Sequence, residues 1–164
     1  MRFNHLKDLL QHQLIKLYSS EQQISQVLPL MAEMAYSKDL RRAFSSHISR
    51  TENQLIRLQK VLENLNISHN GEWCEGMEGL IKECKEIIHA EGEPEIRDSA
   101  LITTAQRINL YEISCYSSVL MFSGELGFDN ASEILEQSLD EEQQIEKDLT
   151  TLAKGGFFSP ATGE

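Results

Sequence analysis

The sequence has few residues that interrupt a helix and no stretch that could cross a membrane. Its 164 residues include 9 glycines and 3 prolines, whereas residue types that favour helix, such as Leu, Glu, Gln, Ala and Lys, are abundant. No apolar run approaches the length of a membrane span. A hydrophobic fraction of 40% with 25% charged residues is typical of a globular protein. We therefore expect one helical domain with a substantial core.

Several functional classes lack the features that they require. The net charge of -11 argues against nucleic acid and anionic membranes as partners, because both are negatively charged. The N-terminus lacks the apolar segment of a signal peptide, and the chain has no glycine-rich phosphate loop or nucleophile elbow. The three cysteines, Cys74, Cys84 and Cys115, include no CxxC pair and suit free thiols in a reducing compartment. These absences favour a cytoplasmic protein.

Apolar residues at three- and four-residue steps predict four long helices. Pro29 lies inside the first helix and should kink it, because the periodicity continues beyond this residue. The third helix is expected from about Glu95 to Leu126. Capping residues mark the boundaries: Asn4, Ser37 and Asp129 at the starts, and Gly127 and Gly155-Gly156 at the ends. The break before Ser37 is short, so the first two helices should be antiparallel neighbours.

A long connection separates the second helix from the third. It contains a turn-rich segment, residues 66–73, and a short helix from Cys74 to about Gly92. This connection is too long for a hairpin loop, but it could run the length of a bundle. The sequence therefore predicts an all-α, ferritin-like four-helix bundle over residues 1–154, with a short extra helix between helices 2 and 3. Residues 155–164 are expected to form a flexible tail.

Acidic residues interrupt the apolar seams near the middle of the predicted helices. Glu21 lies on the first helix, Glu112 on the third and Glu142 on the fourth. Glu52 lies beside the seam of the second helix, and Glu146 follows Glu142 by one turn. A carboxylate in a core is unfavourable unless it is paired. Because the midpoints of antiparallel helices share one depth, we expect these acids in one layer of the core.

Such a layer needs positive charge or protons. Two divalent cations carry about four positive charges, which nearly balance five carboxylates, and di-iron and di-manganese bundles hold metal with Glu residues in this way. Alternatively, the acids could reach solvent at the seam edges or share protons. His47 lies on a polar strip with Thr51 and Gln54, and it could supply a nitrogen ligand or hydrogen-bond within the bundle. Three tyrosines near the layer could support redox chemistry or simply pack: Tyr18, Tyr111 and Tyr116.

Five segments carry a family resemblance. They are LYSSEQQISQVLPLMAEMA (17–35), HISRTENQLIRL (47–58), CEGMEGLIKE (74–83), RDSALITTAQRINLYEISCY (97–116) and LDEEQQIEKDL (139–149). In order and spacing they resemble the YciE/YciF-like family of ferritin-like bacterial proteins, over nearly the whole chain from Leu6 to Ala153. The resemblance implies a four-helix bundle that is usually dimeric and linked to bacterial stress responses. It implies no defined reaction.

The chain also departs from the family pattern. Asn109 occupies part of a Glu-His pair that usually precedes YEI. The ExxH pairs that supply nitrogen to di-iron sites are absent, because Leu55 and Ile145 occupy the third position after Glu52 and Glu142. A site made mainly of carboxylate oxygen suits manganese, iron, magnesium or calcium better than zinc or copper.

We therefore expect a homodimeric, stress-associated protein with a di-metal site of iron or manganese. Its predicted ligands are Glu21, Glu52, Glu112, Glu142 and Glu146, and oxygen or peroxide would be the oxidant. The alternative is a metal-free structural or interaction module that kept the bundle after losing the site, and Asn109 favours this alternative. Iron storage is a third option, but it would need a large shell, whereas the resemblance implies dimers.

Overall fold

The structure is a computed structural model that describes residues 1–69 and 71–155, and this part of the chain is all-α with no strand. The helices are α1 (Leu6–Met34), α2 (Lys38–Asn64), α3 (Glu75–Ile88), α4 (Pro94–Glu125) and α5 (Asp129–Gly155). The predicted all-α class is confirmed, and the structure has a short helix, α3, between α2 and α4. The expected tail lies outside the described residues except for Gly155, which belongs to α5.

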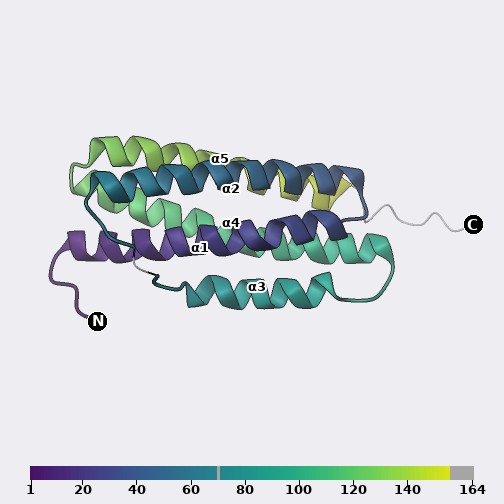
Figure 1. The fold of residues 1–164 in the computed structure, drawn as a ribbon. Coiled ribbons are helices and arrows are strands. Elements are labelled where there is room, and N and C mark those ends of the chain that lie inside the picture. Colours follow the sequence, from purple (N-terminus) through teal and green to yellow (C-terminus); the bar gives the residue numbers. More distant parts are fainter. Residues whose placement is uncertain (70, 156–164) are drawn as a thin grey trace, which may run out of the picture.

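The four long helices pack side by side. The α1 helix packs against α2 and α4, and α5 packs against the same two helices, so each long helix has two long neighbours. Figure 1 shows α2 beside α5 and α1 beside α4. The short α3 helix lies against α1 and α4 on the outer side of this group (Figure 1). The long helices therefore enclose one central region to which all four contribute.

Local chemistry explains where the helices begin and end. The hydroxyl of Ser37 accepts a hydrogen bond from the Asp39 amide at 3.3 Å, as expected for the N-cap of α2. Gly127 has a φ of 69°, a conformation that glycine adopts without strain. The α1 helix continues through Pro29. Its N-cap is His5, whereas the sequence predicted Asn4, and the Asp8 carboxylate accepts the backbone N–H groups of both residues at 3.0 Å.

The core consists of two apolar clusters with polar side chains between them. The first apolar cluster includes Ile24, Leu28, Phe44, Ile108 and Ile145, together with the buried face of α3. The second apolar cluster includes Leu14, Leu17, Leu58, Tyr116 and Leu139. Near the middle of each long helix, one or more buried polar residues fall in sequence between members of the two clusters. We call this group the polar layer; it contains Glu21, His47, Thr51, Gln54, Asn109, Glu112 and Glu142.

The buried face of α4 differs from the predicted seam at two positions. Cys115 and Phe122 are only half-buried, whereas Tyr116 and Ser123 are fully buried. The predicted seam placed Cys115, three residues after Glu112, on the buried face. The helix instead buries Tyr116, four residues after Glu112. Both steps are compatible with a period of 3.6 residues per turn. Tyr116 thereby enters the core beside the polar layer. No helix in residues 1–69 or 71–155 is long and apolar enough to cross a membrane.

Candidate functional site

Three of the five predicted acids meet in the polar layer. Glu21 of α1, Glu112 of α4 and Glu142 of α5 are each 0% exposed. The α2 helix contributes no acid to this layer. Its contribution is the polar strip, since His47, Thr51 and Gln54 are all buried. The shared depth expected from the helix midpoints therefore holds for three acids on separate helices.

The other two predicted ligands lie elsewhere. Glu52 is exposed on α2, because it follows the buried Thr51 by one position, which is a rotation of about 100° around the helix. This position corrects the expectation that Glu52 belongs to the core layer. Glu146 is half-buried, and its carboxylate accepts a hydrogen bond from the Thr150 hydroxyl at 2.7 Å. Neither residue belongs to the buried group of possible metal-ligating side chains.

Three side chains of the polar layer converge closely enough to share an ion. One potential ligand atom each from His47, Glu112 and Glu142 lies within 4.8 Å of the other two. Nε2 of His47 is 3.9 Å from Oε2 of Glu112. Within the described residues, neither nitrogen of His47 and neither carboxyl oxygen of Glu112 has a hydrogen-bond partner. We call these three residues the core triad.

Glu142 differs from Glu112 because amides hold its carboxylate. Gln54 Nε2 donates to one oxygen of Glu142 and Asn109 Nδ2 donates to the other, both at 2.6 Å. The Asn109 amide also donates to the Glu142 backbone carbonyl at 3.1 Å. Asn109, which in the sequence only marked a departure from the family pattern, thus orients a candidate ligand. Burial raises the pKa of Glu142 to about 7, although the hydrogen bonds from the two amides partly oppose this increase.

Glu21 is held from the other side by a tyrosine. The Tyr116 hydroxyl donates to Oε1 of Glu21 at 2.6 Å, whereas Oε2 has no hydrogen-bond partner in the described part of the chain. Burial, together with the charge of Glu142, raises the pKa of Glu21 to about 8. Glu112 lies within hydrogen-bonding reach of Glu21. These two carboxyl groups can therefore share a proton.

The remaining titratable groups leave the layer short of positive charge. Burial raises the pKa of Glu112 well above its ordinary value, and the charges of Glu142 and Glu21 act in the same direction. Burial, together with the charge of Arg50, lowers the pKa of His47 to about 4, so the imidazole is neutral at pH 7. Without an ion, the layer must keep protons on its carboxyl groups. A divalent cation could replace those protons.

The donor set fits such a cation. Two carboxylates and one neutral imidazole form an oxygen-rich donor set with a single nitrogen, which suits iron or manganese. The unpaired atoms of Glu112 and His47 support this fit, because buried polar atoms normally have partners. The sequence identified His47 only as one member of a polar strip with two possible roles. The structure shows the strip facing inward and brings His47 to Glu112.

A small cavity reaches the triad from outside. It has a volume of about 10 Å³, lies between α2 and α5, and is lined by His47, Arg50 and Asp148 among others. This volume is near the size of one water molecule. Arg50 Nη2 and Asp148 Oδ2 lie 4.0 Å apart, and both side chains are partly exposed. A charged pair therefore stands between His47 and solvent.

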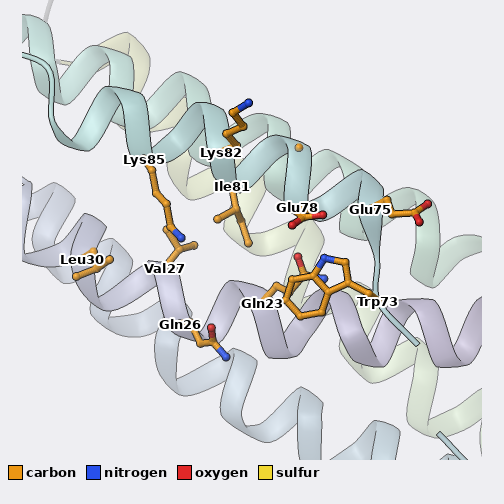
Figure 2. Close-up of a pocket in the computed structure, with 11 residues that line it drawn as sticks. Gln23, Gln26, Val27, Leu30, Trp73, Glu75, Glu78, Ile81, Lys82 and Lys85 are labelled. Atoms are coloured by element: carbon orange, nitrogen blue, oxygen red, sulfur yellow. The ribbon is translucent and has the colours of Figure 1, made fainter. Parts of the chain in front are cut away.

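A surface groove between α1 and α3 lies away from the polar layer. It has a volume of about 730 Å³ between α1 and α3 and contains no residue of the core triad. Figure 2 shows Trp73 and Ile81 beside the groove, with lysine and glutamate side chains around it. The groove is open to solvent and its lining residues carry both positive and negative charges. These residues do not form a cluster of catalytic or metal-ligating groups. The buried triad is therefore the stronger candidate for chemistry.

The fold and the site define the chain as an all-α protein with a buried carboxylate–histidine cluster. The family described as "Domain of unknown function (DUF892)" matches residues 5–159, and the chain belongs to this family. Protein YciF of Escherichia coli (strain K12) is 34% identical over 154 residues, which span 93% of each protein. The resemblance to YciE/YciF-like proteins is thereby confirmed.

Solved structures agree with this assignment. The crystal structure of the E. coli stress protein YciF matches with a TM-score of 0.89 and 34% identity, over 92% of this chain and 96% of that chain. YcfI from Rhodopseudomonas palustris matches with a TM-score of 0.86 and 34% identity, over 90% of this chain and 94% of that chain. The chain is thus a homologue of the stress protein YciF.

Proposed function

We propose that this protein is a ferritin-like four-helix bundle whose core triad binds iron or manganese, and that it acts in a stress response. The convergence of His47, Glu112 and Glu142 within 4.8 Å carries the metal proposal. The stress role is proposed from the similarity to YciF, which is called a stress protein. The expected cytoplasmic location and homodimer remain predictions.

Each residue of the layer has a distinct task in this proposal. His47, Glu112 and Glu142 would hold the ion, and the ion would supply redox chemistry with oxygen or peroxide. Gln54 and Asn109 orient Glu142 through their amides. Glu21 holds a proton beside Glu112, and the Tyr116 hydroxyl positions the Glu21 carboxyl group. Such outer partners tune the ligands that they contact.

The charge of the layer bears on how many ions it takes. Three ionised carboxylates carry a charge of about −3, so one divalent ion leaves about one negative charge, which a single proton on Glu21 neutralises. The two ions expected from the sequence were balanced against five carboxylates, which included Glu52 and Glu146. The core triad accounts for one ion, and a second would require Glu21 to bind metal as well.

Arg50 and Asp148 offer a route for the ion or oxidant. They line the small cavity that ends at His47, and their ion pair is partly exposed to solvent. Exposed ion pairs are weak and break readily.

Metal content after purification tests the proposal. We expect about one Fe or Mn per chain by inductively coupled plasma mass spectrometry, and loss of this metal in Glu112→Gln. Glu52→Gln is the matched control, because it removes a carboxylate from the exposed face of α2. Metal retained in Glu112→Gln, or lost equally in both variants, would contradict the proposal.

A second candidate function is a metal-free structural or interaction module. The observation that favours it is the hydrogen bonding of Glu142, whose two oxygens are already held by Gln54 and Asn109. Its prediction is the opposite one: the protein binds no metal, and Glu112→Gln raises the stability, since neutral Gln removes a buried ionisable group.

A further inference from the structure

The exposed side of α3 carries charges of both signs in a fixed order. Acids occupy the first half of one stripe and lysines the second half: Glu75, Glu78, Lys82 and Lys85. Steps of three, four and three residues keep these side chains on one face of the helix. All four line the groove between α1 and α3 that Figure 2 shows. Within residues 1–69 and 71–155, none of the four forms an ion pair, so their charges are available to another molecule.

The order of these charges is self-complementary. Positions 75 and 85 are equally distant from position 80, and so are positions 78 and 82. We consider two copies of α3 that lie antiparallel about a two-fold axis at position 80. Glu75 then faces Lys85 of the second copy, and Glu78 faces Lys82 in the same way. A two-fold axis makes each of these pairs occur twice, whereas a parallel arrangement would place like charges opposite each other.

The apolar side chains of the groove fit the same symmetry. Trp73 is 49% exposed at one end of the groove, and Leu30 of α1 is 42% exposed at the other end (Figure 2). A two-fold axis through the middle of α3 exchanges these two ends. The indole of each copy therefore covers Leu30 of the other copy, which removes apolar surface of both side chains from water.

The overall charge of the chain favours this face for association. Two copies with a net charge of -11 each repel one another over most of their surfaces. The stripe on α3 is neutral as a whole, because its two glutamates balance its two lysines. The α3 helix also lies on the outer side of the four long helices, where a second molecule can approach it (Figure 1).

We propose that α3 is a self-association surface, on which a second copy of this chain docks its own α3 in the antiparallel orientation. The four ion pairs set the register of the two helices, and the two Trp73 side chains close the ends of the contact. This pairing gives the expected homodimer a defined surface. It does not depend on a metal in the core triad.

Charge reversal on the whole, metal-free chain tests the pairing. Lys82→Glu/Lys85→Glu makes the stripe acidic, and Glu75→Lys/Glu78→Lys makes it basic. Sedimentation velocity in a chelating buffer of low salt should show a wild-type dimer and at least tenfold weaker self-association of each double variant. An equal mixture of the two variants should form dimers again, because an acidic stripe then faces a basic one.

A matched control separates the stripe from the net charge. Lys60→Glu/Lys147→Glu makes the same change in charge as the lysine reversal, at exposed positions of α2 and α5, and it should associate like the wild type. A wild-type chain that stays monomeric would overturn the proposal. Reversed variants that associate as tightly as the wild type, or a mixture that forms no dimers, would overturn it as well. Because metal is absent throughout, none of these results bears on the core triad.

Single cysteines test the antiparallel orientation. Gly79 lies close to the proposed axis, and a Cβ atom there meets no atom of the described chain within 4 Å. In Gly79→Cys, the new thiols of two copies should form a disulfide under mild oxidation. In Glu75→Cys, the antiparallel pairing separates the new thiols by about 15 Å along the helices, too far for a disulfide. Non-reducing electrophoresis should therefore show a cross-linked dimer of the first variant alone, and cross-linking of Glu75→Cys or its absence in Gly79→Cys would contradict the proposed register.

Discussion

The polar layer and the two apolar clusters are built from the same four helices but are stabilised differently. In the apolar clusters, side chains gain free energy from leaving water and packing closely. In the polar layer, each oxygen of Glu142 accepts a hydrogen bond from an amide, whereas the oxygens of Glu112 have no such donor among the described residues and Glu112 can only share a proton with Glu21. Natural cores seldom leave a buried carboxyl group in this state. The polar layer therefore does not gain its stability in the way that the apolar clusters do, and the metal-binding proposal assigns it a role in binding.

The largest effect is expected where the apolar clusters are truncated. Phe44 is fully buried in the first apolar cluster, and Phe44→Ala should lower the free energy of unfolding by about 3–5 kcal/mol through lost burial and a cavity. Chemical denaturation of the metal-free protein measures this change. A loss below about 1 kcal/mol would show that the clusters do not dominate stability.

The polar layer should make the metal-free protein less stable as pH rises. The folded-state pKa is raised to about 8 for Glu21 and to about 7 for Glu142, and that of Glu112 is also raised. The folded state then binds more protons than the unfolded state, so stability falls as pH increases toward the folded-state pKa. His47 acts in the opposite sense only below about pH 6.5, because its folded-state pKa is lowered to about 4.

Between pH 7 and pH 9 we therefore expect a loss of about 2 kcal/mol in the free energy of unfolding. Urea denaturation at several pH values measures it. Manganese should reduce this loss, because the ion takes the place of the protons. Stability that increases over this pH range in the absence of metal would contradict the raised pKa values of the carboxyl groups.

A smaller effect is expected at the tyrosine that borders the layer. Tyr116→Phe removes the hydroxyl that donates to Glu21 at 2.6 Å and should lower stability by about 1–2 kcal/mol. The loss should be greater at pH 9 than at pH 6, because the hydroxyl stabilises the ionised carboxylate more than the neutral acid. Thermal denaturation at the two pH values measures the difference. An equal loss at both pH values would contradict the prediction that the hydroxyl stabilises the ionised form of Glu21.

The smallest effect is expected at the acid that the structure places on the surface. Glu52→Gln should change stability by less than about 0.5 kcal/mol, since Glu52 is exposed. It should also leave the pH dependence of stability unchanged, in contrast to Glu112→Gln. Parallel denaturation of both variants makes the comparison. If Glu52→Gln changed the stability and its pH dependence as much as Glu112→Gln does, exposed and buried carboxyl groups would contribute equally to the pH dependence of stability, contrary to this prediction.

Periodicity was sufficient to predict the helices and the depth of three acids. Glu21, Glu112 and Glu142 lie on strongly apolar seams, so the burial of each helix face brings its acid inward. Glu52 was misplaced because its seam already contained Thr51, and an adjacent residue on a helix points elsewhere.

The contacts between helices could not be predicted in the same way. Whether His47 meets Glu112 depends on how α2 is rotated against α4, which follows from the packing of the whole core. Asn109 looked like the loss of a ligand, yet its amide holds Glu142 from the neighbouring helix. The choice between Cys115 and Tyr116 for burial on α4 was likewise decided by tertiary packing.

The most direct measurement of the central claim is anomalous X-ray diffraction from crystals grown with Mn²⁺, recorded close to the manganese absorption edge. We predict an anomalous peak among His47, Glu112 and Glu142, with Nε2 of His47 and both carboxylates as ligands, and no such peak in Glu112→Gln crystals. Manganese bound only at the surface, with no peak at the core triad and Glu142 still hydrogen-bonded to Gln54 and Asn109, would contradict the metal-binding proposal.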